Sequence, residues 1–159
     1  MTSRILLMCA LGEDINDDTI DFWEDGKLIK KSVSLALKDT FGKLVNRIAD
    51  PHIILFPFLA DTYIFPHERC FMKNAKNLRN LVQKIVDKRR KALRDDPKLA
   101  EDGDFLTILL TDDLFKDNNK RVVDEALTFF FAGIQASAVS TSNLILNLLK
   151  HPEYQTKIL

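Results

Sequence analysis

Residues 119–150, NKRVVDEALTFFFAGIQASAVSTSNLILNLLK, form the stretch that decides the fold. Its spacing predicts one helix over 120–150, because apolar side chains recur every three or four residues. Asn118 or Asn119 is the expected N-cap, since an Asn side chain can accept a hydrogen bond from a free backbone N–H of the first turn. Pro152 suits the first position of a following helix. At about 1.5 Å per residue, the predicted helix would be roughly 45 Å long.

Apolar residues lie on two sides of this predicted helix, which is typical of a core helix rather than a surface helix. The first face carries Val123, Leu127, Phe130, Ile134, Ala138, Thr141, Ile145 and Leu148. The second face carries Thr128, Phe131, Ala132, Gln135, Ala136 and Val139. Gly133 stands in the middle of the helix, although Gly is about 1 kcal/mol less favourable there than Ala. A helix built only for packing has little reason to keep it.

Length and charge limit the class of protein. The chain has 159 residues, which fits one domain or one piece of a larger one, and its formal net charge is zero. A neutral chain has no general attraction to nucleic acid, so no nucleic-acid partner is expected. One basic cluster stands out, and the acids that follow it favour a solvated helix face. Its members are Lys84, Lys88, Arg89, Arg90, Lys91 and Arg94.

The remaining elements are also predicted to be helical. Helices are expected over 3–11, 28–49, 68–95 and 104–110, and no stretch argues strongly for a sheet. Residues 12–27 read as an acidic connection. The helix over 28–49 should end at Asp50, because the residue before Pro51 avoids the α region. The proline-broken apolar segment that follows reads as a packed loop or a short helix. The predicted fold class is all-α.

Cysteine and histidine give weak signals. Cys9 and Cys70 are far apart and form no CxxC motif, so we expect reduced, buried structural cysteines. His67 and Cys70 share a helix face, but two ligands make a poor metal site and a structural role is favoured. The opening residues, MTSRILLMCALG, mimic a signal peptide weakly and favour a helix. No apolar run approaches the ~18 residues that a membrane span needs.

The segments DEALTFFFAGIQAS (124–137) and HPEYQTKIL (151–159) resemble the long central helix and the next turn of the cytochromes P-450, the haem-thiolate monooxygenases. The eukaryotic family pattern there is roughly (A/G)-G-x-(D/E)-T-(T/S), closed by a His-Pro-Glu turn. Upstream, ALGEDI, LFPFL, an FP before the basic helix ending KIVDKRRKAL, and DFLTILL occur in the family's order. The resemblance covers essentially the whole chain, residues 1–159, but only the middle part of the family's fold.

This resemblance implies a cofactor, partners and a cellular place. The complete protein would bind haem (iron protoporphyrin) and insert one oxygen atom from dioxygen into a small apolar substrate. Electrons would come from NADPH through a reductase partner. The resemblance places the complete protein at the endoplasmic reticulum membrane, held there by segments that this chain lacks. The chain alone has no expected anchor and would be soluble or aggregated.

The resemblance also assigns residues on the long helix. Ala132, Gly133 and Ala136 match the haem-facing positions, where small side chains let the haem approach the backbone. Thr128 and Phe131 match positions that look into the substrate pocket.

The chain departs from the family pattern at the oxygen-activation positions. Gln135 stands at the acid position and Ala136 at the alcohol position, so the pair that relays protons in the family is lost. Ser137 is one residue further, about 100° around the helix, and replaces that hydroxyl only if the helix is locally distorted.

Two family features are missing from the sequence. It contains no E-x-x-R ion pair, and neither cysteine lies in the F-x-x-G-x-R-x-C-x-G loop that supplies the axial thiolate. Both features are expected downstream. We therefore expect a fragment that ends just after the long central helix, lacks the C-terminal haem-ligating half and is inactive alone, with no metal ligand of its own.

Simpler interpretations stay open. Gly133 could serve only close helix packing. Gln135 could be an ordinary buried amide or could hold water above a haem. The alternative function is a non-catalytic helical remnant or a module that binds a ligand or a partner.

Overall fold

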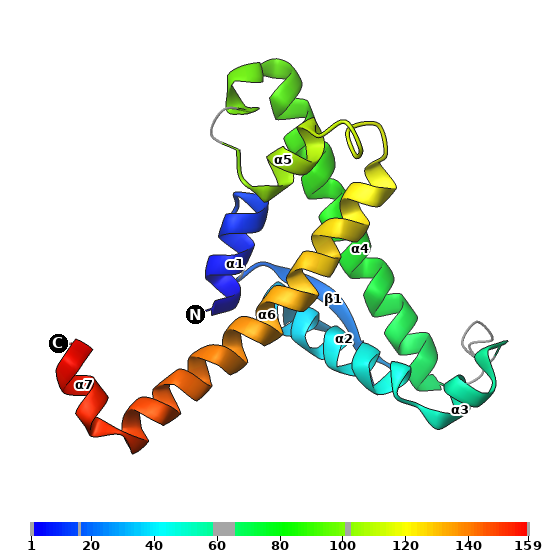
Figure 1. Cartoon of the computed structure of the whole chain (residues 1–159). Helices are drawn as coiled ribbons and strands as arrows, with labels where there is room; N and C mark the ends of the chain where they lie inside the picture. Colours follow the sequence, from blue (N-terminus) through cyan, green and yellow to red (C-terminus); the bar gives the residue numbers. More distant parts are fainter. Residues whose placement is uncertain (1, 16, 59–65, 101–102, 159) are drawn as a thin grey trace.

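The computed structural model describes residues 2–15, 17–58, 66–100 and 103–158, and it is mainly helical, as predicted (Figure 1). Its elements are α1 (Thr2–Leu11), β1 (Thr19–Glu24), β2 (Lys27–Ser32), α2 (Val33–Ile48), α3 (Pro51–Leu55), α4 (Pro66–Asp95), the 3-10 helix η2 (Pro97–Ala100), α5 (Phe105–Thr111), α6 (Asn119–Lys150) and α7 (Pro152–Ile158).

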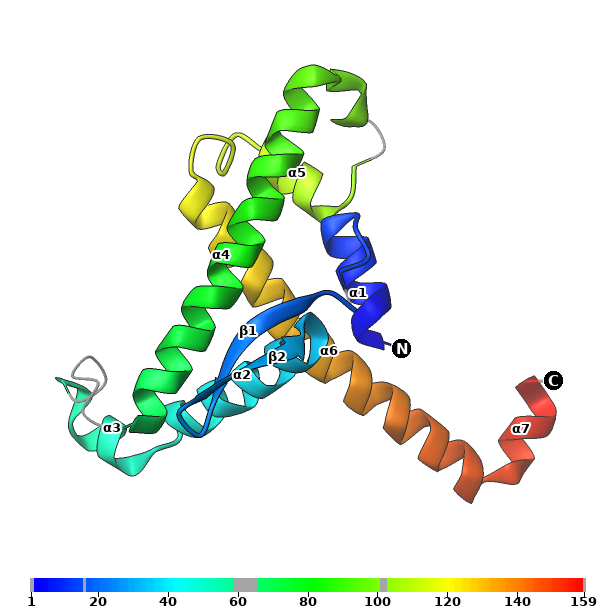
Figure 2. The same cartoon turned by 180° about the vertical axis from the view of Figure 1, so that it is seen from behind.

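The core lies where the first half of α6 meets the other helices. This half packs against α1, α2, α4 and α5. Its buried residues are Val122, Val123, Ala126, Leu127 and Phe130. The second half of α6 and α7 extend away from the rest of the chain as an arm (Figures 1 and 2). The first face of the helix is therefore buried only in its N-terminal part, and Ile145 is 53% exposed.

A β-hairpin replaces two predicted features. Residues expected to be a connection form β1, and residues 28–32, expected to begin a helix, form most of β2. The strands pair antiparallel, with Phe22 opposite Ile29. Asp25 and Gly26 join them with φ values of 47° and 78°. Positive φ at both positions is what a two-residue type I′ turn requires, and Asp-Gly is among its preferred pairs.

The hairpin forms because one of its faces has a place to pack. Phe22 is 1% exposed. The hairpin lies against α2 and α4, on the side of α2 away from α6 (Figures 1 and 2). The prediction of a helix from residue 28 was wrong because period-3.6 and period-2 patterns are hard to separate in a short apolar run.

Side chains cap two of the helices, and one of these caps, Asn118, was predicted. The Asp50 side chain accepts a hydrogen bond from the His52 N–H and caps α3. This backbone bond, followed by the His52 side chain, lowers the pKa of Asp50. Asn118 caps α6 by accepting from the Arg121 N–H. The proline-broken segment forms the short α3, while its residues 59–65 lie outside the described part.

A charged joint holds α1, α4 and α5 together. Arg89 of α4 donates to the Leu11 carbonyl oxygen at 2.9 Å and pairs with Asp104 at 2.8 Å. Asp104 also caps α5 by accepting from the Thr107 N–H. Gly12 ends α1 with φ +67°, and a Cβ there would collide with Asp104 and Arg89. Arg89 was predicted to lie on a solvated helix face, but it connects α1, α4 and α5 instead.

The cysteines are both free. Cys70 is half-buried, but Cys9 is exposed, so the prediction of a buried cysteine is wrong at that position.

Candidate functional site

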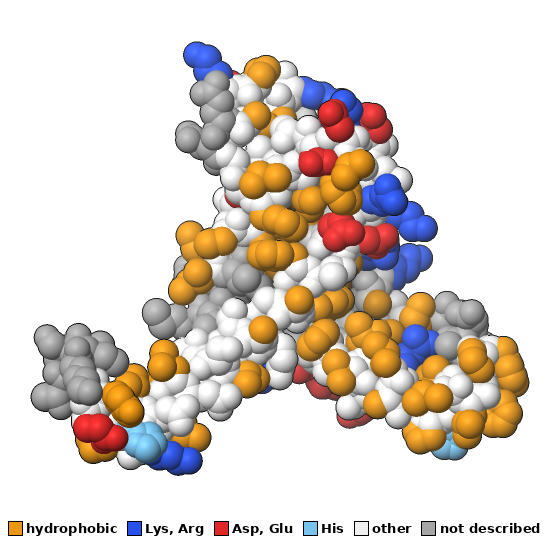
Figure 3. Space-filling view, viewed as in Figure 1, with side chains coloured by type: hydrophobic (Ala, Val, Ile, Leu, Met, Phe, Trp, Pro, Cys, Tyr) orange, Lys and Arg blue, Asp and Glu red, His pale blue; other side chains and the backbone are white. Residues whose placement is uncertain are grey.

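The second face of α6 is largely uncovered in this chain. Thr128, Ala132, Gln135, Ala136 and Val139 are exposed, and only Phe131 is half-buried. Residues 126–149 contain no charged side chain. The arm of α6 is accordingly mostly white in Figure 3, with scattered hydrophobic residues and charges only at its end. The second face is therefore uncharged and mostly exposed, and several of its side chains are small.

The three positions predicted to face haem leave room for a flat group. Ala132 and Ala136 are exposed, Gly133 is half-buried, and α6 is continuous through all three. No side chain larger than a methyl group stands at these positions, so a planar macrocycle could approach the backbone closely. No thiol belongs to this face, because Cys9 is on α1 and Cys70 is on α4.

The polar residues of α6 differ in their partners. The Thr128 hydroxyl donates to the Asp124 carbonyl oxygen at 2.8 Å, which holds it along the helix. Gln135 is exposed, so its interpretation as a buried amide is not supported here. Because α6 is uninterrupted at 135–137, Ser137 stays about 100° around the axis from Ala136. The Ser137 side chain therefore does not lie where the Ala136 side chain lies.

A narrow crevice lies between α2 and α6, beside a contact of the two helices. Phe41 of α2 stacks on Phe131 of α6, with ring centroids 5.3 Å apart and planes at 20°. Leu37, Lys38, Phe41, Phe130, Phe131, Ile134 and Gln135 line the crevice. Its volume of about 10 Å³ leaves room for about one water molecule. Phe131 lines this crevice, but its predicted role in a substrate pocket stays a prediction, since the crevice is too small for a substrate. The contribution of Lys38 and Phe41 was missed, because sequence spacing does not reveal which helix lies opposite.

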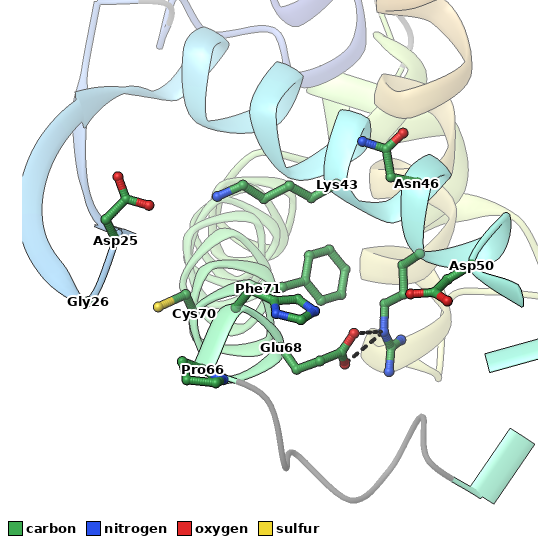
Figure 4. Close-up of a pocket in the computed structure, with 11 residues that line it drawn as sticks. Asp25, Gly26, Lys43, Asn46, Asp50, Pro66, Glu68, Cys70 and Phe71 are labelled. Atoms are coloured by element: carbon green, nitrogen blue, oxygen red, sulfur yellow. Dashed lines mark hydrogen bonds and ion pairs between the residues drawn. The ribbon is translucent and has the colours of Figure 1, made fainter. Parts of the chain in front are cut away.

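A larger pocket of about 560 Å³ lies on the other side of α2 (Figure 4). It is formed by the hairpin turn, the end of α2 and the start of α4. At its base Arg47 Nε donates to both carboxylate oxygens of Glu68, at 3.1 and 3.0 Å. Glu68 is 5% exposed and Arg47 also lies over the Phe71 ring. This ion pair joins α2 to α4.

His67 and Cys70, considered above as metal ligands, both line this larger pocket. Among the residues that the structure describes, no three His, Cys, Asp or Glu side chains gather in an arrangement that could hold a metal ion.

One helix in the described ranges, α6, is long and apolar enough to cross a membrane, judged only by length and composition. The expectation that no run approaches this length was wrong. The core helix of a soluble protein passes the same test, so this property does not assign α6 to a membrane.

Comparison with known proteins identifies relatives across nearly the whole chain. The sequence model of the family described as Cytochrome P-450 matches residues 10–159. Cytochrome P-450 4X1 of Rattus norvegicus is 27% identical over 165 residues, which cover 99% of this chain and 30% of the relative. The Mus musculus protein of the same name has the same identity and coverage.

A further match covers about half of the chain. The cytochrome P-450 monooxygenase sphH of Aspergillus fumigatus is 28% identical over 83 residues, covering 52% of this chain and 15% of the relative. No solved structure matches significantly. The chain spans about 30% of the length of the first relatives.

Proposed function

Because the chain belongs to the cytochrome P-450 family, we propose that it is an internal part of a haem-dependent monooxygenase that inserts one oxygen atom into a small apolar substrate. The observation that carries the proposal is the open second face of α6, with Ala132, Gly133 and Ala136 at its centre. Residues beyond this chain would supply the axial thiolate and the E-x-x-R pair.

On this proposal, each part of α6 has a role. Ala132, Gly133 and Ala136 would let the haem lie close to the helix backbone, and haem when bound would supply the iron at which dioxygen is activated. Phe131, held by its stack with Phe41, and Thr128 would bound the space for an apolar substrate. The neutral face fits this role, because it offers an apolar molecule no charged group to desolvate.

The proposal includes partners and location. NADPH, through a reductase, would supply the electrons, and the complete protein would lie at the endoplasmic reticulum membrane. In this proposal α6 is the central helix of the haem domain and not the anchor, since its first half already packs against α1, α2, α4 and α5.

The decisive experiment changes bulk at one mid-helix glycine. In the full-length protein, Gly133→Leu should abolish the thiolate-type absorbance band of the reduced carbon monoxide complex, because leucine would occupy the haem position. Gly42→Leu is the matched control, since a Cβ at Gly42 of α2 meets no atom within 4 Å. A normal band in Gly133→Leu would contradict contact between this face and haem.

The 159-residue chain separates the proposal from its alternative. Cys9 and Cys70 lie on other helices, so the chain alone should give no thiolate-type band when mixed with haem, reduced and exposed to carbon monoxide. A band from the chain alone would overturn the assignment of the thiolate to another segment. If the full-length protein gives no band either, the non-catalytic ligand- or partner-binding module is favoured.

A further inference from the structure

The 560 Å³ pocket beside the hairpin lies outside the proposed haem site. The hairpin and α6 contact different sides of α2, as both views of the chain show (Figures 1 and 2). Its volume falls within the roughly 300–1,000 Å³ of small-molecule sites. Three separate elements contribute its walls, so it is a cleft between elements, open to solvent on one side, and not a groove on one helix.

Most charged groups of this pocket already have partners. Arg47 and Glu68 form the ion pair at its base, with Arg47 Nε shared between both carboxylate oxygens. Asp50 accepts from the His52 backbone and side chain, 2.8 and 3.0 Å away. These groups shape the pocket but have little capacity left for a ligand.

Two charges of opposite sign remain available. Lys43 of α2 and Asp25 of the hairpin turn line opposite walls and face each other across the hollow (Figure 4). No ion pair of either is found among the described residues, and Lys43 Nζ lies 5.6 Å from the centroid of the Phe22 ring. The exposed Asn46 amide lies one helical turn after Lys43 and lines the same wall.

Apolar groups lie between the two charges. Phe71 and Pro66 line the floor beside the half-buried Cys70. A ligand that satisfied the whole pocket would need an anionic group for Lys43 and Asn46, a cationic group for Asp25, and an apolar body. A simple anion or a simple cation would leave one charged wall unpaired.

We propose that this pocket binds a small zwitterion of the amino-acid type with an apolar side chain. Its carboxylate would accept hydrogen bonds from Lys43 and Asn46, its ammonium would donate to Asp25, and its side chain would pack on Phe71 and Pro66. Such a ligand would contact α2, α4 and the hairpin at once, next to the Arg47–Glu68 pair that joins α2 to α4, and would therefore stabilise their arrangement.

Three probes with the same ring separate the possible ligand chemistries. Phenylalanine carries both charges, phenylacetate only the negative one and phenethylamine only the positive one. Each is titrated into the ¹⁵N-labelled 159-residue chain, and the amide signals of Gly26 and Lys43 report on binding in the pocket. Phenylalanine should bind at least about tenfold more tightly than either analogue, since each lost charge-assisted hydrogen bond is a factor of that order.

The variants remove one charge at a time. Asp25→Asn keeps a favourable Asn-Gly turn, and Lys43→Gln changes an exposed side chain, so both should fold. Each should weaken phenylalanine binding about tenfold or more, while Lys84→Gln, at an exposed lysine of α4 outside the pocket, should not change it. The proposal is overturned if phenylacetate or phenethylamine binds as tightly as phenylalanine, if neither variant weakens binding, or if millimolar phenylalanine does not shift the reporters.

Discussion

The side chain of Asn74 pairs with both backbone polar groups of Trp23, 51 residues earlier in the chain. Its Oδ1 accepts from the Trp23 N–H at 2.7 Å, and its Nδ2 donates to the Trp23 carbonyl oxygen at 2.8 Å. Asn74 is 1% exposed. These bonds satisfy the backbone of Trp23 on the side of β1 that faces α4, while β2 pairs with the other side of the strand. At this residue an edge strand is covered by a helix of the same chain.

Asn74→Ala should destabilise the chain by about 2 kcal/mol, because it leaves a partly buried N–H and a carbonyl oxygen without partners. Trp23 is the chain's single tryptophan, so urea unfolding followed by its fluorescence reports directly on this contact. Asn77→Ala is the control. Asn77 makes only one such bond, to the Asp21 carbonyl oxygen in a solvent-exposed setting, and should cost well under about 1 kcal/mol. Equal effects of the two changes would contradict the special role of Asn74.

Alanine substitutions at Gly12 and Gly26 distinguish the cost of backbone strain from the cost of a steric collision. Both have positive φ, +67° and +78°, but an added Cβ meets Asp104 and Arg89 only at Gly12 and no atom within 4 Å at Gly26. Gly26→Ala should therefore cost about 1 kcal/mol of backbone strain. Gly12→Ala should cost about 2 kcal/mol more, because the Arg89–Asp104 pair must move. Chemical denaturation of both variants tests this order, and similar losses would mean that the joint adapts freely.

The sequence was a good guide to the long helices and a poor one to contacts between distant segments. The strong apolar spacing of α4 and α6, together with Asn118 and Pro152 at the helix ends, predicted these elements close to their observed bounds. The hairpin was missed although Asp25-Gly26 was a usable local signal. What stabilises it, the Asn74 amide, comes from a helix that sequence spacing cannot place opposite it.

The candidate site was predicted to the same extent. Helical spacing grouped the residues of the second face and the family resemblance assigned roles to some of them, but their exposure depends on which segments lie against α6, and that is a tertiary property. The Phe41–Phe131 stack shows the same limit, because each ring was predicted on its own helix and their contact was not.

Lys31 should make stability depend on alkaline pH. Its Nζ bonds to Asp39 at 2.6 Å and to Glu24 at 3.2 Å, and the bond to Asp39 is the main reason that its pKa is raised above 10.5. Because the pKa of Lys31 is higher in the folded than in the unfolded state, the protonated side chain stabilises the fold. This stabilisation is complete below the unfolded-state pKa and is lost as pH rises through the folded-state pKa. Lys31→Met should thus cost about 1 kcal/mol near neutral pH, a low value because both acids are partly solvated.

The pH test compares Lys31→Met with the unchanged chain. The difference in unfolding free energy should be constant from neutral pH to about pH 10 and shrink above it, while the background titration of other lysines cancels. Lys30→Met is the control, since the Lys30–Asp21 pair is 70% and 49% exposed. A difference that grows with pH would contradict the role assigned to Lys31.

Gln135 and Ala136 should limit how well oxygen activation is coupled to product formation, if the proposed function holds. A positioned proton donor is typically worth about 10²–10⁴-fold in rate. Neither residue offers a carboxylate or hydroxyl, so proton delivery would fall to water held by the exposed Gln135 amide. Gln135→Glu with Ala136→Thr in the full-length protein should therefore raise the product formed per NADPH consumed and lower the peroxide released.

Two single changes locate the proton path on α6. Gln135→Ala should increase peroxide release, because it removes the group that would hold the water. Ser137→Ala should leave the coupling unchanged, since the uninterrupted helix keeps this hydroxyl about 100° away from position 136. Peroxide and product are measured in the same reaction, so slow turnover is distinguished from poor coupling. If the double change has no effect and Ser137→Ala increases peroxide, the protons travel along the other side of α6, and Gln135 has no part in their delivery.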